Sequence, residues 1–432
     1  MRILITGATG LIGSHVARRI TRAGHAVVGV ARSPSWARER YPDIEWVEGD
    51  FRSDTTAAQW RPRLKEIDAV VNCAGVLQDG GGDNLQDVHV NGAAALFAAC
   101  EELGVRRVAQ ISAAGADENA PTEFMRSKAE GDQRLMARQL EWVILRPAFV
   151  IGRGVYGGTA LIRGLAGFPF VTPVADGSQA IQTVDISDVA ETVALCLGPR
   201  APHHQVLILA HPERLTLDQV VRQTRRWLGF GERATRPVAK PVAELAYRVG
   251  DLLGHLGWRS PMRTTARQQL ADGVVGDPSH WIAVTGIRPL SFQDWLQRSP
   301  STVQDRWHAR LYFLKPVVIA ALSLVWIFSG LVALGPGFGA AVEQLRHAGF
   351  GPGTAQNLTV VTGLIDLGLG LAILNSRWLK PAAIGMAVTS VFYLLAATVL
   401  APELWLDPLG PIVKIVGLIV LPLVALALAE SR

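Results

Sequence analysis

Four long apolar runs follow Arg310, and they restrict the fold of this chain more than any other feature. Each run is about 20 residues long, the length that a helix needs to cross the hydrocarbon core of a bilayer. Two runs contain no charged residue, one contains a single aspartate and one a single lysine. We therefore predict a bundle of four transmembrane helices in residues 306–432, with spans at 316–334, 354–374, 381–400 and 409–429.

The charges between these runs predict how the bundle is oriented. Basic residues precede the first run and separate the second from the third, whereas acidic residues separate the third from the fourth. Because cytoplasmic loops carry the excess of lysine and arginine, we expect both termini in the cytoplasm. The first residues read as an apolar strand rather than a signal peptide, so the N-terminal part is also expected there. The basic residues are Arg306, Arg310, Lys315, Arg377 and Lys380, and the acidic ones are Glu403 and Asp407.

Two charged residues lie inside the predicted spans. Asp366 is near the middle of its span, where an ionised group costs several kcal/mol unless it faces protein or water. It is either an interhelical structural contact or a group with a proton- or quinone-linked role. Lys414 lies five residues into its span, close enough to the end to extend its amine to the interface. Gly363, Gly368 and Gly370 predict close helix packing around Asp366.

Residues 1–305 have a different composition from the tail. They contain 34 of the 42 basic residues and 32 of the 37 acidic ones, so this part is nearly neutral and shows no nucleic-acid-binding signature. Cys73, Cys100 and Cys196 form no paired motif and have no histidine at a ligand spacing, so neither a disulfide framework nor a metal site is expected.

Short apolar segments alternate with helical patterns through the first half of the chain. Alternation of this kind predicts an α/β fold with a doubly wound parallel sheet. We assign residues 1–150 to its core, and residues 151–305 to its remainder with a smaller substrate-side lobe. The predicted strands are 2–6, 26–30, 46–50, 69–72, 108–111 and 142–145, and the clearest predicted helices are 12–23, 187–197 and 216–228.

A glycine-rich turn joins the first predicted strand to the first predicted helix. Its three glycines are spaced three residues apart. Residues without side chains let backbone amides at a helix N-terminus approach a pyrophosphate. The position of the turn between a buried strand and an amphipathic helix therefore predicts a dinucleotide site rather than a merely structural turn. The expected contacts are Gly7, Thr9, Gly10, Leu11, Ile12 and Gly13.

The residues after the second predicted strand bear on the choice of dinucleotide. An NAD-selective site has an acidic residue here that binds the ribose 2′-hydroxyl, but this chain has Arg32 and Ser33. Because arginine suits a 2′-phosphate, we expect NADP(H) in preference to NAD(H). The alternative is that Arg32 is a solvated surface charge. Asp50, at the end of the third predicted strand, is a candidate contact to the adenine.

Several motifs together resemble the extended or atypical short-chain dehydrogenase/reductases, which are NAD(P)-binding Rossmann proteins. The resemblance covers about residues 1–300 and is greatest to the atypical branch that includes an NADPH-binding accessory subunit of respiratory complex I. It implies cofactor contacts at Ala74 and Gly75, and the tail resembles DoxX-like membrane domains. The motifs are Thr6 to Gly13, Asn72-Cys73-Ala74-Gly75, Asn91, Ser112, Lys128, Arg146-Pro147 and Val184 to Ala190.

The chain departs from that family at the catalytic position. The family has a tyrosine four residues before the lysine, but here Phe124 precedes Lys128, and phenylalanine has no proton to transfer. The resemblance still implies that Lys128 holds the ribose. Ser112 is either a substrate-orienting residue or a turn cap, and Asn91 is either a water-holding residue or a polar group within a helix. Tyr156 is the one tyrosine we consider as a replacement.

Three functions follow from these features. We expect a multi-pass protein of the cell membrane that binds NADP(H) and acts as an oxidoreductase on a hydrophobic or membrane-derived substrate, with a quinone as one candidate. The second hypothesis is a non-catalytic NADP(H)-binding scaffold or redox sensor, because the tyrosine is missing. The third is a sugar-nucleotide epimerase or dehydratase, which needs that tyrosine most. Membrane lipid, membrane proteins and a second copy of the chain are the expected partners.

Overall fold

The computed structural model describes residues 1–80, 82–175, 177–198, 201–258, 262–264, 267–268, 273–408 and 410–429. Residue 409, where the last predicted span begins, and the terminal residues 430–432 lie outside these ranges. The chain divides into two compact units. The first contains Met1–Leu252 and Arg259–Ala309, and the second contains Leu253–Trp258 and Arg310–Arg432.

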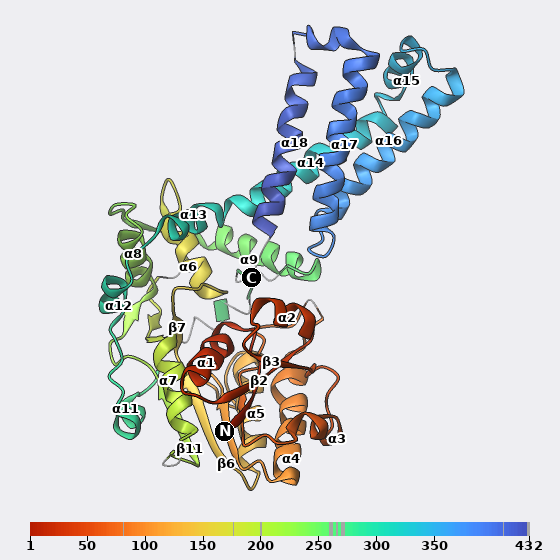
Figure 1. The fold of residues 1–432 in the computed structure, drawn as a ribbon. Helices are drawn as coiled ribbons and strands as arrows, with labels where there is room; N and C mark the ends of the chain where they lie inside the picture. Colours follow the sequence, from red (N-terminus) through yellow and green to blue (C-terminus); the bar gives the residue numbers. More distant parts are fainter. Residues whose placement is uncertain are drawn as a thin grey trace. The chain divides into compact units, whose positions relative to one another are not determined.

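A parallel sheet forms the centre of the first unit (Figure 1). Within the described residues it has seven strands in the order β11-β6-β5-β4-β1-β2-β3, which is the doubly wound arrangement predicted from the sequence. Each strand pairs in parallel with its neighbour, so the carboxyl ends of all seven meet at one edge. The strands are β1 Arg2–Thr6, β2 Ala26–Ala31, β3 Glu45–Glu48, β4 Ala69–Asn72, β5 Arg107–Ile111, β6 Glu141–Pro147 and β11 Gln205–Leu209.

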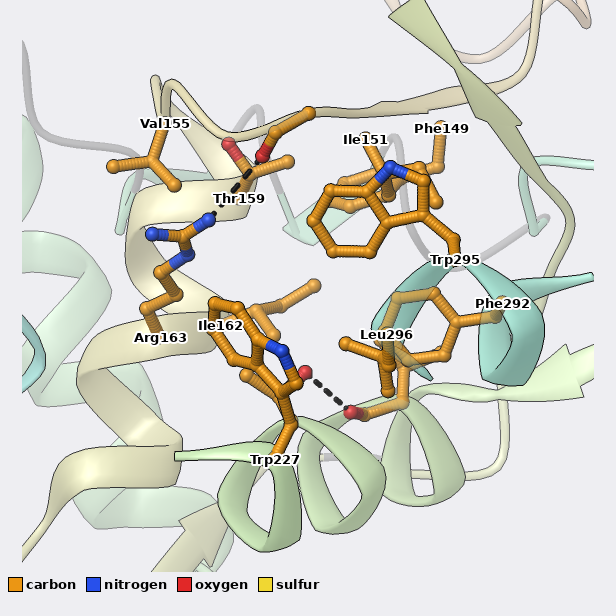
Figure 2. Close-up of a pocket in the computed structure, with 13 residues that line it drawn as sticks. Phe149, Ile151, Val155, Thr159, Ile162, Arg163, Trp227, Phe292, Trp295 and Leu296 are labelled. Atoms are coloured by element: carbon orange, nitrogen blue, oxygen red, sulfur yellow. Dashed lines mark hydrogen bonds between the residues drawn. The ribbon is translucent and has the colours of Figure 1, made fainter. Parts of the chain in front are cut away.

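The residues after β6 form a smaller lobe of short strands and helices, in the region where the sequence predicts the substrate-side lobe. Apolar side chains from α6, α8 and α12 form its core, and Figure 2 shows aromatic rings gathered around a cavity there. Its helices are α6 Gly158–Gly167, α8 Leu217–Trp227, α9 Lys240–His255, α12 Phe292–Arg298 and α13 Val303–Leu311. Its strands are β7 Phe149–Ile151, β8 Thr172–Val174, β9 Ala180–Ile181, β10 Thr183–Asp185, β12 Leu215–Thr216 and β13 Thr235–Pro237.

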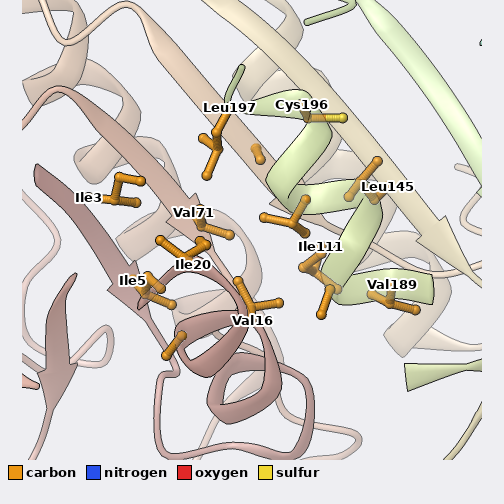
Figure 3. Packing of buried hydrophobic residues seen from close by; sticks show 14 of the residues in the cluster. Ile3, Ile5, Val16, Ile20, Val71, Ile111, Leu145, Val189, Cys196 and Leu197 are labelled. Atoms are coloured by element: carbon orange, nitrogen blue, oxygen red, sulfur yellow. The ribbon is translucent and has the colours of Figure 1, made fainter. Parts of the chain in front are cut away.

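Helices cover both faces of the central sheet. On one face α1 and α7 pack on alternate residues of β1, β4, β5 and β6 (Figure 3). On the other face α3 and α4 bury the remaining strand side chains. Because both faces are covered, the middle residues of the central strands are apolar, as is usual for parallel strands, and polar residues stand at the strand ends. The helices around the sheet are α1 Leu11–Arg22, α2 Pro34–Arg40, α3 Ala57–Trp60, η1 Arg61–Leu64, η2 Asp87–Asn91, α4 Gly92–Leu103, α5 Glu123–Met136, α7 Ile186–Cys196 and α11 Ser279–Thr285.

Two features of the central sheet differ from the sequence prediction. The edge strand β11 was not predicted, because its apolar run is only five residues long and stands among turn residues. Strand β3 ends at Glu48, two residues before the predicted end, so Asp50 lies in the turn that follows the strand.

The described part of the second unit contains four helices that are long and apolar enough to cross a membrane. Their bounds lie within two residues of the predicted spans. A fifth helix, which was not predicted, fills the first connection, and a short 3-10 turn fills the last. These elements are α14 Leu314–Leu334, α15 Phe338–His347, α16 Pro352–Ala372, α17 Leu379–Leu400, η3 Pro402–Trp405 and α18 Pro411–Ala429.

Close glycine contacts hold α14 against α16, as predicted for two of the three glycines. A Cβ at Gly370 would lie 2.8 Å from the Ile327 backbone nitrogen, and one at Gly363 would lie 2.7 Å from the Leu334 side chain. Gly368 differs from the prediction, because a Cβ there would meet no described atom within 4 Å. Small residues therefore let these helices approach at two positions on one face of α16.

Asp366 makes interhelical contacts at the centre of the bundle. Its carboxylate accepts hydrogen bonds from the Ser329 hydroxyl of α14 at 2.7 Å and from the Tyr393 hydroxyl of α17 at 2.9 Å. The side chain is buried. These contacts match the structural alternative proposed for Asp366, since they satisfy a polar group where lipid offers no partner.

We predict that Gly370→Val destabilises the second unit. The added side chain meets the backbone of α14, and overpacking of this kind costs about 1–3 kcal/mol. Gly368→Val is the matched control, because it puts the same residue two positions away in open space. Thermal unfolding of the detergent-solubilised protein measures both variants. Equal unfolding midpoints for the two variants would contradict the packing described here.

Candidate functional site

The glycine turn after β1 brings the N-terminus of α1 close to the end of β4. Gly7 has a φ of +62°, and a Cβ there would lie 2.5 Å from the Cys73 carbonyl oxygen. A Cβ at Gly13 would lie 2.2 Å from the Gly7 carbonyl oxygen. Neither position accepts a larger residue without movement of the backbone. Glycine at 7 and 13 is therefore what allows this close approach.

The first turn of α1 has the features of an anion site. Its N-cap is Gly10, and no described side chain caps the first N–H groups of the helix. Such groups, with the positive end of the helix dipole, favour a phosphate. Thr9, Leu11 and Ile12 are partly exposed around the turn. The residues present thus fit the pyrophosphate of a dinucleotide.

A buried hydrogen-bond network links the ends of three strands behind this turn. The Thr6 hydroxyl donates to the Asn72 side-chain carbonyl, and the Asn72 amide donates to Gln110 at 2.7 Å. The Ala74 N–H also donates to the Asn72 carbonyl, at 3.2 Å. This network orients the Ala74-Gly75 segment, in which Gly75 is exposed to solvent. Sequence reasoning missed Thr6 and Gln110 as members of the site.

Lys128 is buried at the ends of β4 and β5. Its Nζ donates to the Ile111 carbonyl at 3.1 Å, and a Cβ on Gly75 would lie 3.1 Å from the same Nζ. Burial lowers the pKa of Lys128 to about 8. Burial also raises the pKa of the neighbouring Cys73 thiol to about 12, so this thiol stays protonated. The structure thus places Lys128 next to a segment predicted to contact the cofactor.

His89 lies behind Lys128 and was not singled out from the sequence. Its Nε2 accepts the Val76 N–H at 3.1 Å, so Nδ1 carries the proton and donates to the Ser127 hydroxyl at 2.9 Å. Burial and the nearby Lys128 lower the pKa of His89 well below its usual value. The imidazole is therefore neutral, and both its nitrogens are occupied.

Phe124 fills the position of the family's tyrosine with an aromatic contact. Its ring meets the His89 ring edge to face, with centroids 5.5 Å apart. Its carbonyl accepts the Ser127 hydroxyl at 3.0 Å. Phe124 thus retains the packing of an aromatic residue there but supplies no proton.

Ser112 hydrogen-bonds to a second buried group that sequence reasoning missed. Its hydroxyl donates to an Asp132 carboxylate oxygen at 2.8 Å, and the Arg146 Nη2 donates to the same oxygen at 2.9 Å. The other Asp132 oxygen has no hydrogen-bond partner among the described residues. Burial raises the pKa of Asp132. Asp132 is four residues after Lys128 on α5, and that spacing was the available signal.

The expected adenosine end of the site is already ion-paired. The Arg32 Nη1 donates to the Asp83 carboxylate at 2.8 Å, with the arginine side chain 50% exposed and the aspartate 6% exposed. Arg52 pairs with Asp50 at 2.5 Å, and this hydrogen bond lowers the pKa of Asp50. Ser33 is the exposed N-cap residue of α2. Arg32 is therefore a surface charge that is paired with Asp83, while half of its side chain remains exposed to solvent.

Two further candidates lie at exposed positions. The Asn91 side chain is exposed and donates to Asp87 one turn earlier, at 3.1 Å. This matches the alternative of a polar helix group. Tyr156 is 42% exposed at the start of α6, where its backbone N–H donates to Thr159.

A small apolar cavity lies in the substrate-side lobe (Figure 2). Its volume is about 30 Å³, enough for about one water molecule. Arg163 is at its wall, paired with Asp305 at 2.5 Å and lying 5.0 Å over the Trp227 ring. The charge is thus neutralised and the cavity wall is mainly aromatic. Phe149, Ile151, Trp227, Phe292 and Trp295 are among the lining residues.

The parallel sheet, the glycine turn at its central strand and the buried lysine define a Rossmann-type dinucleotide-binding domain. Comparison with protein families agrees: residues 7–197 match the NAD(P)H-binding family and residues 323–423 match the DoxX-like family. The chain therefore combines an NAD(P)H-binding Rossmann domain with a C-terminal DoxX-like domain, which confirms the predicted resemblance.

Curated relatives share the nucleotide-binding part. The chain is 28% identical over 222 residues to an uncharacterized protein of Mycobacterium tuberculosis, covering 51% of this chain but only 23% of that protein. It is 24% identical to the 40 kDa subunit of mitochondrial NADH-ubiquinone oxidoreductase of Neurospora crassa, over 67% of this chain and 76% of the subunit. It is 27% identical to a ceramide reductase of Caulobacter vibrioides, over 46% of this chain and 61% of that enzyme.

A solved structure confirms the fold. The Bordetella bronchiseptica enzyme WbmG, in complex with NAD and UDP, superposes with a TM-score of 0.55 and 19% identity over 72% of this chain and 96% of that enzyme. At this identity the likeness concerns the fold alone.

We predict that Lys128→Met changes how stability depends on pH. The buried amine loses its proton at about pH 8, whereas the amine of the unfolded chain, with the ordinary pKa of 10.5, keeps its proton to a higher pH. The unfolded state therefore holds more protons between these values, and wild-type stability should rise over this range relative to the variant, by at most ~3 kcal/mol. Unfolding midpoints from pH 7 to 10.5 measure the difference.

Lys65→Met is the control for this titration, because Lys65 is exposed. Its difference from wild type should stay constant with pH. Parallel profiles for wild type and Lys128→Met would show that the Lys128 pKa is not lowered in the folded protein.

Proposed function

We propose that this chain is a membrane-anchored NADP(H)-dependent oxidoreductase whose substrate is hydrophobic or derived from the membrane. The observation that carries the proposal is a turn fitted to a dinucleotide in the same chain as four apolar helices of membrane-spanning length. The named relatives support it, since one is a subunit of an NADH-ubiquinone oxidoreductase and another is a ceramide reductase. The loop charges favour a cytoplasmic Rossmann domain and cytoplasmic termini.

The site residues would hold the cofactor, and one of them, Lys128, would also be the proton donor. The backbone around Gly7, Gly10 and Gly13 would hold the pyrophosphate, and Lys128 would hold the ribose next to Ala74 and Gly75. When bound, the dinucleotide supplies a hydride. The substrate oxygen then needs a proton, and Lys128 is the buried cation at the ends of β4 and β5. Reduction of a quinone depends least on a proton donor in the site, whereas reduction of a simple carbonyl depends on it most.

The first test is to purify the protein in detergent, identify its released nucleotide by mass, and follow NADPH oxidation with quinones and long-chain carbonyl lipids. Oxidation with one of these acceptors supports the proposal. Phe124→Tyr should raise carbonyl reduction by about 10²-fold, because it supplies the missing proton donor, and should leave quinone reduction unchanged. Phe97→Tyr, at a buried position in α4, controls for the added hydroxyl.

A non-catalytic scaffold or redox sensor is the second candidate, and Phe124 is the observation that favours it. In that case NADP(H) would be recovered bound, no acceptor would be reduced, and Phe124→Tyr would not create activity. This outcome would reject the oxidoreductase proposal.

We also propose that Arg32 selects NADP(H), although Asp83 competes for it. Arg32→Ala should weaken NADPH binding about tenfold and leave NADH binding nearly unchanged, since a charged hydrogen bond to the 2′-phosphate is lost. Asp83→Asn should tighten NADPH binding, because it removes the competing carboxylate. Arg40→Ala, on exposed α2, is the control. Equal effects of Arg32→Ala on both nucleotides, measured by titration, would reject the assignment.

A further inference from the structure

Helix α9 presents a stripe of apolar side chains to the outside of the molecule. Val242, Leu245, Val249 and Leu252 are between 47% and 64% exposed. They are separated by three and four residues along a 16-residue helix, so they share one face. Isolated exposed apolar residues are common, but four on one helical face need a covering surface.

The opposite side of α9 is already covered by its own chain. A Cβ on Gly250 would collide with the Met262 carbonyl, so the backbone passes directly against the helix there. Asp251 accepts hydrogen bonds from Arg263 at 3.2 Å and from the Thr264 hydroxyl at 2.8 Å. The two faces of the helix therefore differ: one is packed and ion-paired, and the other is apolar and is not covered by the described part of the chain.

The residues that follow α9 are fixed at the end of two membrane helices. The Trp258 indole N–H donates to the Leu374 carbonyl at 2.7 Å, and the Leu256 carbonyl accepts the Ser376 N–H at 3.1 Å. Leu374 and Ser376 lie in the turn between α16 and α17, where both leave the apolar layer. Tryptophan is typical of this level of a membrane protein, with its ring among the headgroups.

We propose that α9 lies in the membrane–water interface, with its apolar stripe in the acyl-chain border of the leaflet where α16 ends and α17 begins. The stripe ends at Leu252, only six residues before Trp258, which is hydrogen-bonded to the turn between α16 and α17. No long linker therefore separates the stripe from the level of the lipid headgroups. Lys240 and Arg248 are exposed on the helix and suit phosphate headgroups. The occupant of the stripe is thus phospholipid.

Spin labelling of the full chain tests this location. Single cysteines replace Val242, Leu245, Val249 and Leu252 in turn, and the labelled protein is reconstituted in vesicles of phosphatidylcholine and phosphatidylglycerol. The collision rate of each label with oxygen, which concentrates in lipid, is compared with that of a water-soluble nickel chelate. Glu244→Cys, exposed on another side of α9, is the matched control. Labelled wild type gives the background from Cys73, Cys100 and Cys196.

The proposal expects a ratio of oxygen to nickel collisions several-fold higher at the four stripe positions than at Glu244→Cys. A nickel-dominated ratio at the stripe would show that it faces water and overturn the proposal. Low collision with both reagents would show a protein cover, such as a second copy of the chain, and would overturn it as well. Since all four positions are exposed, failure of one variant to fold leaves the others to decide.

Discussion

The approach of the Gly7 backbone to the carbonyl of Cys73 is the contact on which the nucleotide site depends. No side chain fits between them, so the end of β1, the end of β4 and the first turn of α1 meet without intervening atoms. This brings the uncapped N–H groups of α1 to the edge of the sheet where all strands end, the position at which doubly wound folds bind ligands. The network of Thr6, Asn72 and Gln110 then holds that edge in place.

Burial favours the neutral form of each ionisable group behind this edge. The His89 imidazole is neutral, the Cys73 thiol is protonated, and burial shifts the pKa values of Lys128 and Asp132 toward their neutral forms. Phe124 extends this low-polarity environment at the position where the family has a phenol. A charged group placed among these residues would therefore lose hydration without gaining a partner of opposite charge.

Local patterns predicted the elements, whereas contacts between distant residues could not be predicted. The strand-turn-helix unit and the four spans follow from apolar periodicity and length. Strand β11 and helix α15 were missed because their patterns are short. The pairs His89–Ser127 and Arg32–Asp83 join residues that are 38 and 51 positions apart. The packing of helices and the path of the loops bring these residues together, and neither can be predicted from local patterns. Gly131 shows the same dependence, since a Cβ there would lie 2.3 Å from the His89 carbonyl.

The direction of one hydrogen bond fixes the polarity of a buried serine. The Ser112 hydroxyl already donates its proton to Asp132, so towards an incoming molecule it has only lone pairs. An O–H or N–H group that reached this oxygen would find an acceptor, whereas a carbonyl would meet lone pairs until the hydroxyl rotated and Asp132 lost a donor. In this orientation the Ser112 hydroxyl is therefore an acceptor, and not a donor, towards any group other than Asp132.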